Sequence, residues 1–436
     1  MTTPKTPSVN IITLGCSKNN VDSEVIAAQL QKMGYEVLHN STRDTDMVII
    51  NTCCFIHDAK EQSIDEIFIH AERKKQGLVK KIYVVGCLAQ RYKNDLQELI
   101  PEVDAFYTFA ELHKLFKLDQ FDLLNQHERL LSTPSHYAYL KISEGCDRSC
   151  SYCAIPLIRG KQVSKPIETL VEEAKQLVQS GVKELLLIAQ DLTYYGMDLT
   201  QHRDLEMLLR RIAQIDGLEW IRLHYAYPIG FPYEILDVMN EYSNICKYLD
   251  MPLQHINEDI LRDMRRGGGG MQTYKLIENI RNKVPGITLR TTLISGYPTE
   301  TKAMHKELVE FVKEVRFERL GVFAYSQEED TPAYPLGDPI RTSEKNRRVE
   351  EIMSLQEEIS LAHNENFVGK VMKVLVDYEE NDFYVGRSEF DSPDVDNTIL
   401  INKKQKLDIG NFYPVRIDQA DHYDLYGTVI KANKEA

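Results

Sequence analysis

Short apolar runs alternate with amphipathic stretches through the first 125 or so residues. The runs 9–14, 46–50 and 81–85 are mostly apolar and rich in β-branched residues, which is typical of strands. The stretches 21–33, 57–75 and 93–100 place apolar side chains near helical spacing. Nearly continuous apolar strands separated by helices predict an α/β fold with a doubly wound parallel sheet, covered on both faces.

The same alternation recurs on a larger scale from about residue 132 to 340. It predicts strands at 138–142, 184–188, 220–224, 248–251, 288–294 and 320–324, with helices between most of them, such as 167–179 and 304–315. Six parallel strands of this kind predict a partial (β/α)6 barrel that is open on one side. In such barrels active sites gather at the carboxyl ends of the strands.

The last part of the chain changes character. A charged amphipathic helix is predicted over 343–365, and its expected buried side consists of Val349, Ile352, Met353, Leu355 and Ile359. Short β segments follow at 371–378, 383–388, 398–402, 413–419 and 425–431. They predict a small OB-like β-barrel. We therefore expect three domains, over 1–128, 132–365 and 366–436.

Composition and charge narrow the class of protein. The chain has 436 residues, 43% of them hydrophobic, and a net charge of −14. That charge argues against a general electrostatic grip on nucleic acid. The segment from 367 onward has 9 Lys+Arg against 13 Asp+Glu, 9 − 13 = −4, which suits a basic protein partner; Asp391, Asp394 and Asp396 are candidates for that surface. No secretory h-region or membrane-crossing apolar run occurs, so we expect a cytoplasmic protein.

Cys146, Cys150 and Cys153 form a C-x3-C-x2-C loop just after the first predicted barrel strand. Three thiolates at this spacing can hold three corners of an iron–sulfur cube and leave the fourth iron open to a small molecule. A structural zinc site needs four ligands, but no Cys or His occurs in the next twenty residues. A disulfide framework would leave one cysteine unpaired and suits small secreted domains. The loop therefore favours a redox enzyme.

Three further cysteines occupy equivalent places in the N-terminal part. Cys16, Cys53 and Cys87 each follow a predicted strand, and the carboxyl ends of parallel strands are where ligands bind. Gly15 and Gly86 directly precede two of them and permit close backbone approach. Unrelated core cysteines are the alternative, but the repeated placement favours a second cluster with an open iron.

Two cysteines remain. Cys54 could replace Cys53 as a ligand, but adjacent residues at a strand end point to different sides, so one of the two should face the cluster. Cys246 has no partner pattern and is interpreted as a packing residue.

Polar residues also follow the barrel strands. They are candidates for holding a ligand, or else capping residues: Gln190, Asp191, His224, Tyr225, Gln254, His255, Ser295 and Gly296. The glycine run 267–270 lacks the Lys-Ser/Thr of a P-loop and is interpreted as a flexible turn after Arg265 and Arg266.

These residues carry a family resemblance. Tyr152 completes C-x3-C-x-aromatic-C, which resembles the signature of the radical S-adenosylmethionine (SAM) superfamily. Over essentially its whole length the chain is similar to the radical-SAM methylthiotransferases, with a C-terminal TRAM domain. The segments Leu-Gly-Cys-Ser-Lys-Asn (14–19), Val-Asp-Ser-Glu (21–24), Lys-Ile-Ser-Glu-Gly-Cys (141–146), Gln-Asp (190–191), Tyr-Gly (195–196) and Asp-Met-Pro-Leu-Gln-His (250–255) resemble the branch that modifies an aspartate of the twelfth protein of the small ribosomal subunit. Cys54 and Thr299 depart from the pattern.

The resemblance implies cofactors and their ligands. It implies two [4Fe-4S] clusters, one on Cys16, Cys53 and Cys87 and one on Cys146, Cys150 and Cys153, with Cys53 favoured over Cys54. It also implies SAM at the second of these clusters, where Tyr152, Gln190, Asp191, Gln254 and Gly296 are the expected cofactor-binding residues.

The implied reaction is a transfer. Reduction of SAM would generate a radical that removes hydrogen from the aspartate β-carbon, and the other cluster would provide the methylated sulfur. The expected partners are the ribosomal protein, free or in the ribosome, and a low-potential electron donor such as flavodoxin or ferredoxin, with no membrane. Two alternatives stay open: a tRNA methylthiotransferase acting on a modified adenosine next to the anticodon, and a noncatalytic iron–sulfur electron carrier or RNA-binding adaptor.

Overall fold

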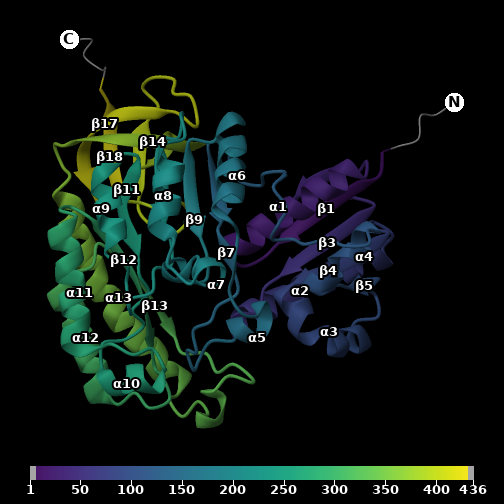
Figure 1. The fold of residues 1–436 in the computed structure, drawn as a ribbon, viewed down its shortest axis with the longest axis horizontal. Coiled ribbons are helices and arrows are strands. Elements are labelled where there is room, and N and C mark those ends of the chain that lie inside the picture. The colour runs from purple at the N-terminus through teal and green to yellow at the C-terminus, as the bar shows by residue number, and fades with distance from the viewer. Residues whose placement is uncertain (1–5, 431–436) are drawn as a thin grey trace.

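The computed structural model describes residues 6–430. Three compact parts follow one another along the chain (Figure 1). The N-terminal sheet lies beside the large central sheet, and the C-terminal β-barrel, coloured yellow, covers one end of the central strands.

The N-terminal part is a parallel five-stranded sheet in the order β2-β1-β3-β4-β5. Buried side chains of α1 and α4 pack on one face, and those of α2 and α3 on the other. The predicted doubly wound sheet is therefore confirmed. Its elements are β1 (Ser8–Thr13), α1 (Ser17–Lys32), β2 (Glu36–His39), β3 (Met47–Thr52), α2 (His57–Lys75), β4 (Lys81–Gly86), α3 (Cys87–Leu99), β5 (Ala105–Phe106) and α4 (Leu112–Phe116).

Two helices of this part begin earlier than the apolar spacing predicts. Helix α1 starts at Ser17 instead of residue 21, and α3 starts at Cys87 instead of residue 93. The first turn of α1 has no apolar residue, yet Asn19 is fully buried, because its amide donates to the carbonyls of Leu14, at 2.8 Å, and Thr52, at 3.1 Å. Both helix starts thus lie at the strand ends, where the cysteines are.

The central part is an open parallel sheet in the order β13-β12-β11-β10-β9-β6, which confirms the partial barrel. Its strands are β6 (Tyr137–Lys141), β9 (Glu184–Ile188), β10 (Trp220–Leu223), β11 (Ile245–Asp250), β12 (Thr288–Ser295) and β13 (Arg319–Ala324). The helices packed outside it include α6 (Ile167–Gln179), α8 (Leu205–Ala213), α9 (Glu234–Glu241), α11 (Gly270–Lys283) and α12 (Lys302–Val315), and their apolar sides share one large core with the sheet.

The C-terminal part is a closed barrel in the order β14-β15-β16-β18-β17. Its strands are β14 (Val371–Glu380), β15 (Phe383–Arg387), β16 (Thr398–Asn402), β17 (Phe412–Ala420) and β18 (Asp424–Val429). The predicted small barrel is confirmed, although residue 431, included in its last predicted strand, lies outside the described residues.

The loop 388–397 between β15 and β16 joins this barrel to the central sheet. Asp391 accepts hydrogen bonds from Arg319 at 2.5 and 3.0 Å, and Asp396 accepts one from Tyr248 at 2.7 Å. Both carboxylates are buried. The expectation that Asp391 and Asp396 form a surface for a partner is therefore wrong, while Asp394 is exposed. The reason is that the central sheet contains the largely buried Arg290 and Arg319, which need carboxylate counter-ions within the molecule.

Helix α13 (Thr342–Glu365) also differs from its predicted amphipathicity. Ile352 and Ile359 are buried as expected, but Val349, Met353 and Leu355 are half-buried. Polar residues complete the buried side, because they bond to partners on neighbouring segments: Lys345 to the Tyr325 carbonyl, Arg348 to Glu300, Gln356 to the Phe317 carbonyl and Asn364 to the Asp421 carbonyl.

None of the helices within residues 6–430 combines the length and the apolar character that crossing a membrane requires.

The loop contact gives a stability prediction. Asp391→Ala leaves the Arg319 guanidinium buried without its carboxylate, which should lower the free energy of unfolding by about 3–5 kcal/mol. Asp418→Ala is the control, because Asp418 pairs with Arg416 at the surface and its loss should cost less than about 1 kcal/mol. Urea denaturation measures both, and equal losses in the two variants would contradict this account.

Candidate active site

The loop with Cys146, Cys150 and Cys153 leaves the central sheet at the carboxyl end of β6. The Arg148 amide donates to the Cys146 sulfur at 3.4 Å, and the Arg266 guanidinium donates to the Cys150 sulfur at 3.7 Å. Burial raises the pKa of Cys146 to about 11 and the pKa of Cys153 to about 12, with the nearby Cys150 thiol adding to both shifts. The three thiols thus lie together in a sheltered, donor-rich loop.

Cys16, Cys53 and Cys87 converge at the carboxyl edge of the N-terminal sheet. Cys16 caps α1, Cys53 follows β3, and Cys87 opens α3. At Gly15, with φ of +90°, a Cβ atom would lie 2.7 Å from the Cys53 Cβ, so glycine is required for this approach. The pKa of Cys53 is raised to about 12, chiefly by burial and in part by the nearby Cys87 and Cys16 thiols.

Cys54 lies in a different environment from Cys53. It is fully buried in the apolar core that includes Ile67, Leu88 and Cys87, on the α2 and α3 side of the sheet. Cys53 instead contacts Gly15, which directly precedes Cys16, and the thiols of both Cys87 and Cys16 raise the pKa of Cys53. Its proximity to both thiols favours Cys53 as the third member of the set.

Both sets of cysteines fit an iron–sulfur cube by their chemistry. Each offers three converging thiols, and one sulfur of each set accepts a hydrogen bond from a buried arginine: Cys87 from Arg159 at 3.4 Å and Cys150 from Arg266 at 3.7 Å. Hydrogen bonds to the sulfurs help to set the reduction potential of a cluster, and binding to iron deprotonates a thiol whose pKa burial has raised.

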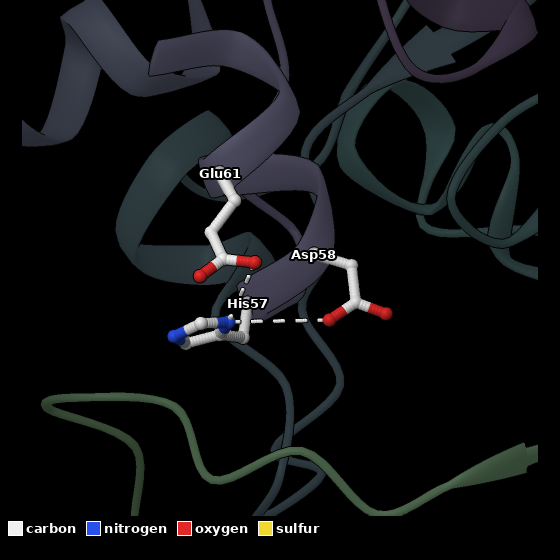
Figure 2. A group of neighbouring side chains, drawn as sticks. All are labelled: His57, Asp58 and Glu61. Atoms are coloured by element: carbon white, nitrogen blue, oxygen red, sulfur yellow. Dashed lines mark ion pairs between the residues drawn. The ribbon is translucent and has the colours of Figure 1, made fainter. Parts of the chain in front are cut away.

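A third group of side chains, outside the two cysteine sites, is close enough to hold one metal ion. Among residues 6–430, His57, Asp58 and Glu61 hold their ligand atoms within 4.8 Å of one another at the start of α2 (Figure 2). All three are exposed, and the His57 ring lies 3.9 Å from Asp58 and 3.7 Å from Glu61. Exposed ion pairs of this kind are solvated and weak.

A buried network of charges joins the two sets of cysteines. Arg159, on α5 (Ile155–Arg159), donates to Asn19 at 2.6 Å, to Asp22 at 2.7 Å and to Glu144 at 2.9 Å. Lys141 pairs with the same two carboxylates, Asp22 and Glu144. Burial opposes the charge of Glu144, but Arg159 and Lys141 outweigh it and lower its pKa below the usual range. The N-terminal sheet is thereby fixed on the mouth of the central sheet.

The residues predicted to bind SAM surround Cys146, Cys150 and Cys153. The Gln190 amide donates to Glu144 at 2.5 Å, and Asp191 accepts from Arg148 at 2.8 Å. The Tyr152 hydroxyl lies 3.2 Å from a guanidinium nitrogen of Arg266.

Two more of these residues have a positive φ, which glycine adopts freely but which is strained for Gln254. Gly296 has a φ of +83°, and its amide donates to Glu300. Gln254 has a φ of +71°, and its Oε1 is buried with no hydrogen-bond partner among residues 6–430. A ligand with a donor group would satisfy this oxygen.

Several residues that were not predicted as site residues belong to this site: Lys18, Glu144, Arg148, Arg159 and Arg266. Arg266 directly precedes the glycine run interpreted as a flexible turn, and it is buried against Cys150. They share one feature that the sequence displays: each is a charged residue that lies within six positions of a cysteine motif or directly beside the glycine run 267–270.

The chain matches three family models in succession. Residues 8–108 match uncharacterized protein family UPF0004, residues 140–312 match the radical SAM superfamily, and residues 368–430 match the TRAM domain.

Relatives resemble the chain over nearly its full length. The ribosomal protein uS12 methylthiotransferase RimO of Cytophaga hutchinsonii is 52% identical over 97% of this chain and 98% of that protein. RimO of Christiangramia forsetii is 50% identical over 98% of this chain and 95% of that protein. RimO of Phocaeicola vulgatus is 50% identical over 98% of this chain and 100% of that protein.

Solved structures share the fold. The radical SAM methyltransferase TsrM of Kitasatospora setae, with tryptophan and a SAM analogue bound, aligns with a TM-score of 0.52 at 14% identity, over 86% of this chain and 79% of that one. The cobalamin-dependent radical SAM enzyme OxsB aligns with a TM-score of 0.50 at 14% identity, over 80% of this chain and 56% of that one.

The choice between Cys53 and Cys54 can be tested by iron content. Cys53→Ala should lose the iron of one cluster after anaerobic reconstitution, about half of the total, because two thiols hold a cube poorly. Cys54→Ala, the matched control, should keep its iron. Iron and sulfide analysis measures both, and the reverse pattern would assign the ligand to Cys54.

The role of Arg159 can be tested by stability. Arg159→Met leaves Asp22 and Glu144 with Lys141 alone, which should lower the free energy of unfolding by about 3–5 kcal/mol. Arg159→Lys should recover part of this loss. Arg211→Met, which removes an exposed pair with Glu168, should leave the urea midpoint unchanged, and a similar shift in both Met variants would refute the proposed network.

Proposed function

Since the chain belongs to the RimO family of radical SAM methylthiotransferases, we propose that it transfers a methylthio group to the β-carbon of an aspartate in ribosomal protein uS12. The observation that carries this proposal is the pairing of two three-cysteine sites at one junction, linked through Arg159 and Glu144. One site suits radical formation and the other suits sulfur supply, and the reaction needs both.

The cofactors are two [4Fe-4S] clusters and SAM. We assign one cluster to Cys146, Cys150 and Cys153 and the other to Cys16, Cys53 and Cys87. When bound, they supply one-electron chemistry that activates a C–H bond, together with the sulfur that replaces the hydrogen.

The chain's own residues orient these groups and exclude water. Arg266 fixes Cys150 and Tyr152, while Arg148 fixes Asp191. The buried network around Arg159 seals the junction, and a site closed to water protects a reactive species. We propose that Tyr152, Gln190, Asp191, Gln254 and Gly296 bind SAM.

Charge supports a protein substrate. The chain carries a net charge of −14, and a ribosomal protein that contacts RNA carries basic surface, so the two attract each other. We further propose a low-potential flavodoxin or ferredoxin as electron donor and the cytoplasm as the place of action. We also propose domains over residues 1–128, 132–365 and 366–436.

The alternatives fit less well. A tRNA methylthiotransferase needs basic surface for its polyanionic substrate. The segment from 367 onward instead carries a net charge of −4, from 9 Lys+Arg and 13 Asp+Glu. An electron carrier binds its cube through four cysteines, whereas each site here offers three.

Mass spectrometry of uS12 tests the function. In a deletion strain the mass added by methylthiolation should disappear from uS12, and the wild-type gene should restore it. A gene with Cys16, Cys53 and Cys87 all changed to Ala should not restore it, because the sulfur-supplying site is gone. Loss of a tRNA methylthio group with uS12 unchanged would overturn the proposal.

A further inference from the structure

Lys18 is a buried cation at the junction of the two cysteine sites. It lies in the first turn of α1, two residues after Cys16, and is 9% exposed. Its ammonium nitrogen lies 3.4 Å from the centre of the Tyr225 ring, just beyond the end of β10. The side chain thus reaches from the N-terminal sheet into the mouth of the central sheet.

Three other buried cations at this junction have carboxylate partners. Lys141 and Arg159 share Asp22 and Glu144, and Arg129 pairs with Glu24 and Glu173. Lys18 makes no hydrogen bond or ion pair with any residue between 6 and 430, and the Tyr225 ring is its one charge-stabilising contact there. The Lys18 ammonium thus lies in a largely enclosed place without a counter-ion of its own, so it suits an anion from outside the chain.

The surroundings of Lys18 strengthen the attraction for an anion. The N-terminus of α1, where the first backbone amides point outward, carries a partial positive charge. Tyr225 has a φ of +66°, a strained conformation for a residue other than glycine. Strain of this kind persists at functional sites, where it holds a side chain in a required place.

The chemistry of the reaction identifies the anion. The carboxylate of an aspartate is bonded directly to the β-carbon that receives sulfur, and Lys18 stands beside Cys16, in the site that supplies sulfur. On the basis of the proposed function, we infer that Lys18 binds the side-chain carboxylate of the substrate aspartate and so directs the β-carbon toward the cluster on Cys16, Cys53 and Cys87. Lys18 is then a specificity-determining residue.

The test compares uS12 carrying its target aspartate with uS12 carrying Asn there. Binding is measured by titration calorimetry with the reconstituted full-length enzyme, under anaerobic conditions and with S-adenosylhomocysteine in place of SAM. The wild-type enzyme should bind the Asp form at least tenfold more tightly than the Asn form. Lys18→Met should bind both forms equally, and Lys18→Arg, which keeps the charge, should retain most of the preference.

Lys60→Met is the matched control. Lys60 also connects the N-terminal and central parts, but it has its own carboxylate partner, Glu328 at 2.9 Å. It should therefore leave the preference for Asp unchanged.

Two results would overturn the inference. The first is equal affinity of the wild-type enzyme for the two forms of uS12, and the second is an unchanged preference in Lys18→Met. A loss of SAM affinity in Lys18→Met, with the preference for Asp intact, would assign the cation to the cofactor carboxylate instead. These results are independent of the uS12 mass measurement, so failure of this inference is distinguishable from failure of the proposed function.

Discussion

The arrangement of this protein depends on a buried ion network between the N-terminal and central parts. Asp22 from helix α1 and Glu144 from the short strand β7 (Ser143–Glu144) are both held by Lys141 and Arg159. Such charges are stable in an interior only when every partner is present. The network therefore makes the relative position of the two parts an all-or-none property, and it fixes the distance between the two sets of cysteines along with it.

The repeating elements were predictable because they follow from local pattern. The six central strands and helices such as α6 and α12 bury apolar side chains at regular spacing, and the sequence displays that spacing directly. Cys16, Cys53 and Cys87 were found for a related reason, because each follows a strand and parallel topology gathers strand ends. Cys146, Cys150 and Cys153 were found from their spacing within one loop. The short edge strands β2 and β5 bury little and left no comparable pattern.

The polar interior was not predictable from pattern. Arg266 stands just before a glycine-rich turn, and Asp391 was predicted to belong to an acidic surface loop, yet both are buried against partners 116 and 72 residues away in the sequence. Pairing over such separations depends on the tertiary fold, which periodicity does not encode. The same limit applies to α13, whose buried side is largely polar because its partners belong to other segments.

The loop 388–397 has a consequence for biosynthesis. Arg319 is made 72 residues before its partner Asp391, so at about 5–20 residues per second it waits roughly 4 to 14 seconds for its counter-ion during translation. Until then the nascent central sheet contains a guanidinium that cannot be buried at low cost. A polypeptide released before residue 391 is therefore exposed to proteolysis, and messages that end before the codon for Asp391 yield no smaller working enzyme.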